Sequence, residues 1–496
     1  MEFNQLPRGL PGTGRAIGEA PRSLWMDPRV LQESDFWSYE TGKLFIGESL
    51  QGDLLGIADN RHLLTIAGSR AGKGTSAIIP NLLLYPGSVL VLDPKGENAS
   101  ITAERRGLGR DVPLGGLGQD IFVIDPFGIA DVDETYLSGF NPLAGLDPTA
   151  NDFVDECDAI ADALVVEDAN RDGGDHWSNS ARSILRGYIA WVAAAPTVNK
   201  RDLNEVRRLI FLPAGIDEPG EFEMQLFAML NDPDDEGSMI AHGVPHEAAS
   251  ALISMSDRER SGVLSTVREN IAFLSSPPIA KTLSNKNRSP DLKAWKFGNN
   301  SVYLCLPASR LHRHFRMFRL FINRLLGAVE SSPEVPETPA LMILDEMHVL
   351  GHMKSLETAA GLLAGYGVRI WSIWQDLAQL KQIYRDRWET FLGNASIFQT
   401  FGLNDMSTLK YVSERLGVSS IGQVSQSEIS VAQAASGFSG QSMSIQASPL
   451  LSPDEIAYFF SRQSGNQLII YPGADPIMIR RLSYLDDRMK DLRPQQ

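Results

Sequence analysis

The chain has 496 residues, a formal net charge of −16, 43% hydrophobic residues and 21% charged residues. This length allows two or three domains with cores of their own, and the composition is that of a globular protein. The acidic balance argues against a protein that coats nucleic acid with its whole surface, although it does not exclude a ring whose pore is basic. The two cysteines, Cys157 and Cys305, exclude a disulfide framework and favour a reducing compartment.

The sequence contains no candidate membrane span. A transmembrane helix needs about 20 mostly apolar residues, and apolar runs such as YIAWVAAA (188–195) are much shorter. The N-terminus also lacks the apolar core of a signal peptide. We therefore expect a cytoplasmic protein, which would need a partner to bring it to the inner membrane.

Seven short apolar runs, each ending in a polar residue or a glycine turn, are typical of buried parallel strands. They span residues 62–68, 88–97, 120–128, 301–307, 340–346, 368–376 and 396–402. Because helical patterns fall between many of these runs, the sequence predicts an α/β fold with a doubly wound core.

The alternation of strands and helices stops between residues 146 and 295, where the segments 151–168 and 177–195 are helical in pattern and no convincing strand occurs. We predict that 146–295 is an all-helical domain inserted into a motor domain. The motor domain would comprise 44–145 and 296–496, after an N-terminal extension of residues 1–43. Within it, the Ser/Gln-rich segment 419–448 is predicted to be either a mobile loop or an edge hairpin, since composition does not decide between them.

The segment AGSRAGKGTS (67–76) follows the first predicted strand and precedes a helical pattern. A glycine-rich turn in this position presents backbone N–H groups to phosphate oxygens, and Lys73 would reach the outer phosphates. Two positions depart from the pattern G-x-x-x-x-G-K-[ST], because Ala67 replaces the first glycine and Gly74 replaces the hydroxyl residue. The residues predicted to bind the nucleotide are Gly68, Ser69, Arg70, Ala71, Gly72, Lys73, Gly74 and Thr75.

Two acids at the end of the predicted strand 340–346 provide a second element. Asp345 is placed to hold magnesium through water, and Glu346 to orient or deprotonate an attacking water. A buried strand that merely ends in two acids is the alternative, and the presence of Lys73 makes it less favourable. Gln375 ends the next predicted strand, where it would sense the γ-phosphate or only cap the strand. Together these elements predict a P-loop ATPase with ATP and Mg²⁺ as cofactors.

Arginines on other segments are candidates for a finger that completes the site of a neighbouring subunit. Arg369 would be such a finger or a strand-end salt bridge. Residues 310, 313, 316, 319 and 324 are arginines on one probable helix, and they would form a basic interface, a pore surface or a finger, or else a solvated face. The pair His348 and His352 lacks the order of a metal-binding motif, and we interpret it as structural.

With these residues identified, the chain resembles the type IV secretion coupling proteins, which are conjugative DNA-transfer ATPases of the FtsK/HerA group. Short segments such as LDEMHVLG (344–351) and DHWSNSAR (175–182) carry the resemblance in the family's order. The other matching segments are 59–99, 124–128, 140–148, 259–279, 374–384 and 472–487.

The resemblance implies a RecA-like motor domain with an inserted helical domain. It also implies a homo-hexamer around DNA, possibly monomeric without it, in which ATP hydrolysis drives the strand through. In this family a glycine often follows the lysine, so Thr75 or water would complete the magnesium shell, and Gly68 would give the turn its flexibility. The implied partners are the DNA backbone, a relaxase or another secreted protein, and components of the secretion system. Many members carry an N-terminal transmembrane region, so we expect this chain to be a soluble form.

Two alternatives stay open. The protein could be an adaptor that recruits a protein substrate through its helical domain, with nucleotide binding setting only its assembly. It could also be a defence or plasmid-control ATPase of the same fold, which would differ only in biological context.

Overall fold

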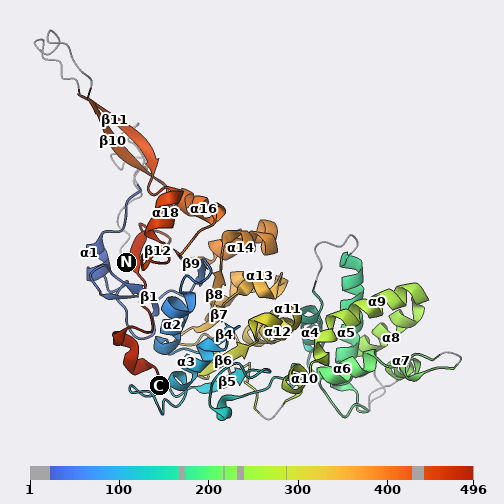
Figure 1. Cartoon of the computed structure of the whole chain (residues 1–496). Coiled ribbons are helices and arrows are strands. Elements are labelled where there is room, and N and C mark those ends of the chain that lie inside the picture. Colours follow the sequence, from blue (N-terminus) through green and yellow to red (C-terminus); the bar gives the residue numbers. More distant parts are fainter. Residues whose placement is uncertain are drawn as a thin grey trace, which may run out of the picture.

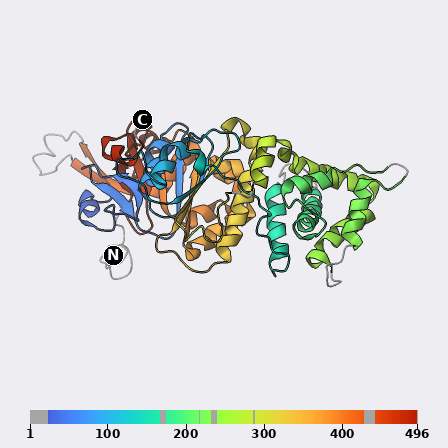
Figure 2. The same cartoon turned by 90° about the horizontal axis from the view of Figure 1, so that it is seen from below.

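The computed structural model describes residues 23–166, 174–215, 218–231, 239–285, 288–426 and 441–494. Its centre is an eleven-stranded sheet with the order β2-β1-β13-β12-β9-β3-β8-β7-β4-β6-β5. Figure 1 shows a helical region on one side of this sheet and the β10–β11 hairpin pointing away on the other. From below, the molecule is elongated, with the helical region at one end (Figure 2).

Seven neighbouring strands of the sheet are parallel, and they confirm the seven predicted strands. They are β3 (His62–Ala67), β4 (Val89–Asp93), β5 (Asp120–Ile124), β6 (Asn300–Cys305), β7 (Ala340–Leu344), β8 (Val368–Trp374) and β9 (Ala395–Phe401). Nearly all of their residues are buried. Strands covered on both faces need apolar side chains at successive positions, which explains the continuous apolar runs in the sequence.

Successive strand residues pack against different helices. In β4, Val89 and Val91 join the core beneath α2 (Ile79–Leu84) and α3 (Glu97–Arg106). Leu90 and Leu92 join the larger core on the opposite face. The helices of that face are α12 (Arg316–Glu330), α13 (Lys354–Leu362), α14 (Leu377–Tyr384) and α16 (Met406–Leu416). The predicted α/β fold with a doubly wound core is therefore confirmed.

An antiparallel extension, which the sequence analysis did not predict, completes the sheet beyond β9. It consists of β12 (Asn466–Ile470), β13 (Ile477–Arg480), β1 (Leu44–Glu48) and β2 (Leu54–Ile57). The short helix α1 (Pro28–Glu33) packs here through Leu31. This extension brings the C-terminal strands beside the first parallel strands, where the nucleotide site is predicted.

The elements between β5 and β6 in the described ranges are helices, and they form the helical region of Figure 1. They are α4 (Phe153–Leu164), α5 (Gly174–Ala194), α6 (Leu203–Ile210), α7 (Glu221–Asn231), α8 (Val244–Ser254), α9 (Asp257–Asn270) and α10 (Pro277–Ser284). Helix α5 packs against α4, α8 and α9, while α4 packs against α12 of the sheet region. The division into an inserted domain at 146–295 remains our proposal.

Shorter elements complete the fold, namely α11 (Leu311–His314), α15 (Glu389–Gly393) and α18 (Pro453–Phe459). Strands β10 (Val418–Gln426) and β11 (Gln441–Pro449) pair with each other in antiparallel register, so the described part of the Ser/Gln-rich segment is a hairpin. Among the helices that the structure describes, none is long and apolar enough to cross a lipid bilayer.

Asn81 fixes the helix after the phosphate loop to the antiparallel extension. Its side chain is 1% exposed and lies on α2. The carboxamide accepts a hydrogen bond from the Phe45 N–H at 2.9 Å and donates to the Phe45 carbonyl at 2.8 Å and to the Ala77 carbonyl at 2.9 Å. One buried amide therefore satisfies the backbone of both elements.

We expect Asn81→Leu to lower the free energy of unfolding by about 1–3 kcal/mol, because the N–H and carbonyl of Phe45 lose their partner in a buried place. Urea unfolding followed by circular dichroism would measure the change. The control is Asn231→Leu at the exposed end of α7, which should change the stability by less than about 0.5 kcal/mol. Equal stability of the two variants would contradict this role of Asn81.

Candidate nucleotide-binding site

The carboxyl ends of β3, β8 and β7 meet at one edge of the sheet, because β8 lies between the other two and all three are parallel. The loops after them bring together three residues that the sequence analysis selected. Lys73 Nζ lies 3.5 Å from Glu346 Oε1. Gln375 Nε2 donates a hydrogen bond of 2.9 Å to Glu346 Oε2. Asp345 precedes Glu346 at the end of β7.

The loop after β3 has the backbone of a tight turn, but Gly68 does not make the turn. The left-handed positions are Arg70, with φ 57°, and Gly72, with φ 97°, whereas φ of Gly68 is not positive. A Cβ on Gly68 would lie 2.2 Å from the carbonyl oxygen of Gly402. We expected Gly68 to give the turn its flexibility, and this reason was wrong. Glycine is required at position 68 because two backbones approach each other closely there.

The remaining loop residues have clear positions. Ala67 ends β3 and packs with Ala71 against Phe401, so small side chains fit there. Ser69 and Arg70 are exposed. A Cβ on Gly74 would meet nothing within 4 Å in the part of the chain that the structure describes, so a hydroxyl residue would fit at this position.

A π-helical turn, Gly74–Ile78, begins directly after the lysine and continues into α2. The hydroxyls of Thr75 and Ser76 both donate to the carbonyl oxygen of Gly72, at 3.1 and 2.7 Å. These bonds use the hydroxyl protons and leave oxygen lone pairs. The magnesium role that we predict for Thr75 therefore stays a prediction.

Lys73 is held in an environment that suits an anion. Its side chain is 10% exposed. Its Nζ atom is buried and has no hydrogen-bond partner among the described residues, since the contact with Glu346 is longer than a hydrogen bond. An ammonium group has three donors, and burial without acceptors is costly. The site therefore fits a ligand with oxygen acceptors at this point.

Two adjacent acids have opposite pKa shifts. Burial raises the pKa of Asp345 to about 6, although the positive charge of Lys73 opposes the shift. Burial also acts to raise the pKa of Glu346, but His348, Lys73 and Gln375 outweigh it and lower this pKa to about 2. Glu346 is thus ionised at neutral pH. Its backbone lies in the left-handed region at φ 55°, a conformation that is strained for a residue with a side chain.

Two residues near these acids had no site role in the sequence analysis, which interpreted His348 as structural and did not consider Asp93. His348 Nδ1 lies 3.3 Å from Glu346 Oε2, so this histidine belongs to the site. Asp93 ends β4 beside β7, and burial raises its pKa to about 6, with a further contribution from the charge of Asp345. The sequence signal for Asp93 was available, because Asp93 stands at the end of its apolar run as Asp345 does after the apolar residues of β7.

Arg481, from the segment after β13, also contacts the phosphate loop and was missed. Its guanidinium donates to the carbonyl oxygen of Ala71 and to that of Arg462 at 2.8 Å. It also stacks on Phe401, with 4.7 Å between the guanidinium carbon and the ring centre. In the same segment, the N–H of Tyr484 donates to the carbonyl of Thr75 at 2.8 Å. The C-terminal segment therefore supports the loop at Ala71 in its middle and at Thr75 near its end.

The candidate fingers lie elsewhere. Arg369 is 2% exposed and lies near the start of β8, away from the edge where Gln375 lies. A finger must extend from the surface, so we do not retain this role for Arg369. Of the arginine row, Arg316 donates to the carbonyl of Leu164, Arg319 is buried, and Arg324 pairs with Glu156 at 2.8 Å. These three form neither a solvated face nor an open basic surface.

The sheet order, the loop after β3 and the acids after β7 define a RecA-like P-loop fold. The bacterial conjugative coupling protein TrwB, in an N-terminally truncated unbound form, has the same fold with a TM-score of 0.66, at 15% sequence identity and 97% coverage of each chain. Another structure of TrwB, with the non-hydrolysable ATP analogue ADPNP, has a TM-score of 0.63, also at 15% identity, and covers 94% of this chain and 96% of that one.

The chain belongs to the family of type IV secretory system conjugative DNA transfer proteins, whose model matches residues 23–496. The conjugal transfer protein TraG of Agrobacterium fabrum is 27% identical over 520 residues, covering 98% of this chain and 73% of TraG. Protein VirD4 of the same organism is 27% identical over 447 residues, covering 88% of this chain and 61% of VirD4. The chain thus corresponds to part of the length of each relative. The resemblance to type IV coupling proteins is confirmed.

The loop geometry makes opposite predictions for two of its glycines. We expect Gly74→Thr to fold normally and to keep nucleotide binding, because its Cβ points into open space. Gly68→Ala should weaken ATP binding by about tenfold or more, because its Cβ would force the loop away from Gly402 and misplace the phosphate contacts. Titration with a fluorescent ATP analogue would measure both. Unchanged binding by Gly68→Ala would contradict the close-approach explanation.

Proposed function

We propose that the protein is an ATP-hydrolysing coupling ATPase that recruits DNA and moves it during conjugation or type IV secretion. The observation that supports this most strongly is the convergence of Lys73, Glu346 and Gln375 at the carboxyl edge of the sheet. A phosphate-binding lysine beside a water-activating carboxylate is what ATP hydrolysis requires.

The residues at this edge fit ATP and magnesium. The buried ammonium of Lys73 lacks a hydrogen-bond acceptor within the described ranges, and the left-handed Arg70 and Gly72 shape a turn whose N–H groups suit phosphate. Lys73 and the backbone of residues 68–75 would hold the phosphates. Asp345, through water, and the hydroxyl of Thr75 would hold Mg²⁺. When bound, ATP and Mg²⁺ supply the transferable phosphoryl group and the neutralising charge.

Glu346 would orient and deprotonate the attacking water. Its carboxylate is ionised at neutral pH, and Gln375 and His348 both contact its Oε2 atom. Gln375 therefore connects the end of β8 to the water-activating group, and this is how it would report the presence of the γ-phosphate. Part of the low pKa of Glu346 comes from Lys73, so a lysine that binds phosphate instead would leave a stronger base.

The names of the relatives support the DNA-handling part of the proposal, since they include conjugal transfer proteins and a type IV secretion system-coupling protein. We propose a homo-hexamer around DNA, monomeric without it, that grips backbone phosphates and needs no base contacts. A relaxase or another secreted protein and components of the secretion system would be its protein partners.

In the adaptor alternative, nucleotide binding at the same site sets only the assembly of the protein. An adaptor that only binds nucleotide would not require the two acids, Asp345 and Glu346. It would also not require the hydrogen bond by which Gln375 positions Glu346. A defence ATPase of the same fold would share the chemistry and differ in its cellular context.

Steady-state ATP hydrolysis without DNA, with single-stranded DNA and with duplex DNA tests the proposal. We expect DNA to stimulate wild-type turnover and to shift the particle mass to that of a hexamer. Lys73→Ala should lose ATP binding. Glu346→Gln should keep ATP binding but lower kcat by about 100-fold or more, because a positioned base contributes that much.

The exposed Lys410→Ala and Glu414→Gln on α16 are matched controls and should behave as the wild type. ATP binding without turnover at any DNA concentration would contradict the proposed motor and favour the adaptor. A rate of ATP hydrolysis that is the same with and without DNA would support the ATPase activity and contradict DNA-dependent movement.

A further inference from the structure

Arg319 on α12 is a buried cation whose partners are backbone carbonyls. The side chain is 3% exposed. Its Nε donates to the carbonyl of Ala163 at 3.0 Å and its Nη2 to that of Asp162 at 3.3 Å. Its Nη1 donates to the carbonyls of Leu350 at 2.9 Å and His352 at 2.7 Å. Burial lowers the pKa of Arg319 to about 10, so the group remains a cation at neutral pH.

These four carbonyls belong to two different parts of the molecule. Asp162 and Ala163 are in the last turn of α4, where unpaired carbonyls and the helix dipole favour a cation. Leu350 and His352 belong to the loop that begins at Glu346 and passes through the 3₁₀ turn Met347–Leu350. One rigid, planar guanidinium therefore ties the loop that carries the catalytic carboxylate to the first helix of the helical region.

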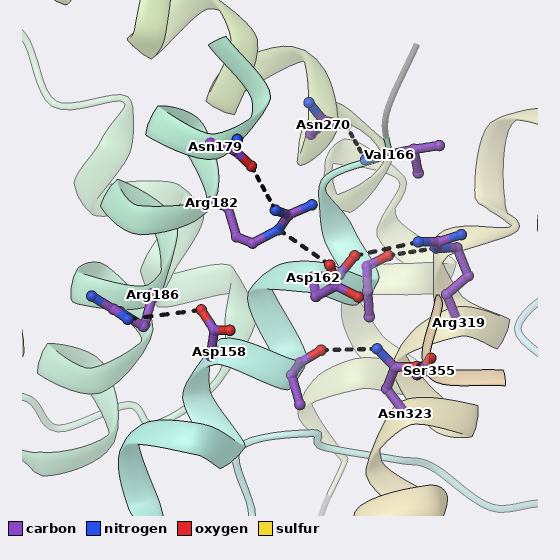
Figure 3. Close-up of polar contacts among 12 residues, drawn as sticks. Asp158, Asp162, Val166, Asn179, Arg182, Arg186, Asn270, Arg319, Asn323 and Ser355 are labelled. Carbon is purple, nitrogen blue, oxygen red and sulfur yellow. Dashed lines mark hydrogen bonds and ion pairs between the residues drawn. The ribbon is translucent and has the colours of Figure 1, made fainter. Parts of the chain in front are cut away.

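The contact continues from α4 to α5 (Figure 3). The carboxylate of Asp162, whose carbonyl binds Arg319, forms an ion pair of 3.2 Å with Nε of Arg182. One turn earlier, Asp158 lies 3.9 Å from Arg186. These ion pairs connect the end of α4 to α5, which packs against α8 and α9.

Part of the surroundings of this contact is open rather than close-packed. A cavity of about 720 Å³ lies between the helices, and its lining includes Asp158 and Asp162 of α4, Arg182 of α5, Arg319 and Asn323 of α12, and Ser355 of α13. Polar contacts cross this part of the interface, among them Asn323 to the Ala159 carbonyl at 3.1 Å. Shifting helices around a cavity loses fewer apolar contacts than shifting them within a close-packed core.

We propose that Arg319 is a positioning residue that couples the loop carrying Glu346 to α4 and α5. Nucleotide that engages Lys73 and Glu346 moves this loop, and Arg319 passes the movement to the helical region. In the opposite direction, a partner that holds the helical region sets the position of Glu346 and thereby the rate of hydrolysis. This inference rests on the proposed nucleotide site and adds a route by which the site and the helical region regulate each other.

Two substitutions of Arg319 and two controls on the same helix separate coupling from packing. Arg319→Met removes all four hydrogen bonds, and Arg319→Lys keeps the charge but cannot reach both carbonyl pairs at once. Arg316→Met removes bonds to the Leu164 carbonyl and the Asn270 side chain, and Arg324→Met removes the ion pair with Glu156. Both controls disturb the α12 contacts with the helical region and leave the Leu350 and His352 carbonyls bound.

The measurement is amide hydrogen exchange with and without magnesium and ADPNP, together with kcat, KM and the dissociation constant of ADPNP. We expect ADPNP to change exchange in wild-type segments 346–352 and 158–166. In both Arg319 variants the change at 158–166 should vanish and kcat should fall by about tenfold to a hundredfold, with ADPNP affinity kept. Both control variants should keep the response at 158–166 and most of kcat.

An ADPNP response at 346–352 but not at 158–166 in the wild type would overturn the coupling, and this test needs no variant to fold. A wild-type response and kcat in Arg319→Met would also overturn it. If the wild type fails to bind ADPNP, both the proposed function and the coupling that depends on it are contradicted. If the wild type binds and hydrolyses ATP while the Arg319 variants respond as the controls do, only the coupling fails.

Discussion

The ion pair of Lys73 with Glu346 is the interaction on which the site depends. Two opposite charges about 4 Å apart attract by roughly 4 kcal/mol at the effective dielectric of a protein surface, before desolvation is subtracted. Lys73 is 10% exposed and Glu346 24% exposed, so neither charge is well hydrated. The parallel register of β3, β8 and β7 creates this pair, and Gln375, His348 and the strained backbone of Glu346 keep the carboxylate aimed at the lysine. Phosphate would compete with Glu346 for Lys73, and in our proposal this competition would move the loop after β7.

Residues from distant parts of the sequence hold the two loops that carry Lys73 and Glu346. The antiparallel extension places Arg481 against the loop that holds Lys73, and Asn81 fixes the helix after that loop to β1. On the opposite side, Arg319 holds the loop after Glu346 and the end of α4 together. The nucleotide site therefore lies between the sheet and a helical region that is attached through buried apolar residues of α4 and α12 and through polar contacts beside a cavity.

Much of this could be predicted from the sequence, for physical reasons. Strands buried on both faces produce continuous apolar runs, and residues at the carboxyl ends of parallel strands meet at one edge, so Lys73, Glu346 and Gln375 could be selected together. The strands β1, β2, β12 and β13 were missed because their short apolar stretches contain glycine or polar residues and are not separated by helical patterns. His348 was interpreted as structural and Arg481 was missed, because their contacts depend on the fold rather than on sequence spacing. Arg369 was misjudged because six residues of extended strand span about 20 Å, so nearly the full length of β8 separates it from Gln375.

The structure of the protein with ADPNP and magnesium would test this arrangement most directly. We expect Lys73 Nζ to bind phosphate oxygens and to lie farther from Glu346 than the 3.5 Å of the present structure, while Gln375 stays bound to Glu346. A nucleotide bound elsewhere, or a Lys73 still paired with Glu346 when the nucleotide is present, would contradict the assignment of this edge of the sheet as the catalytic site.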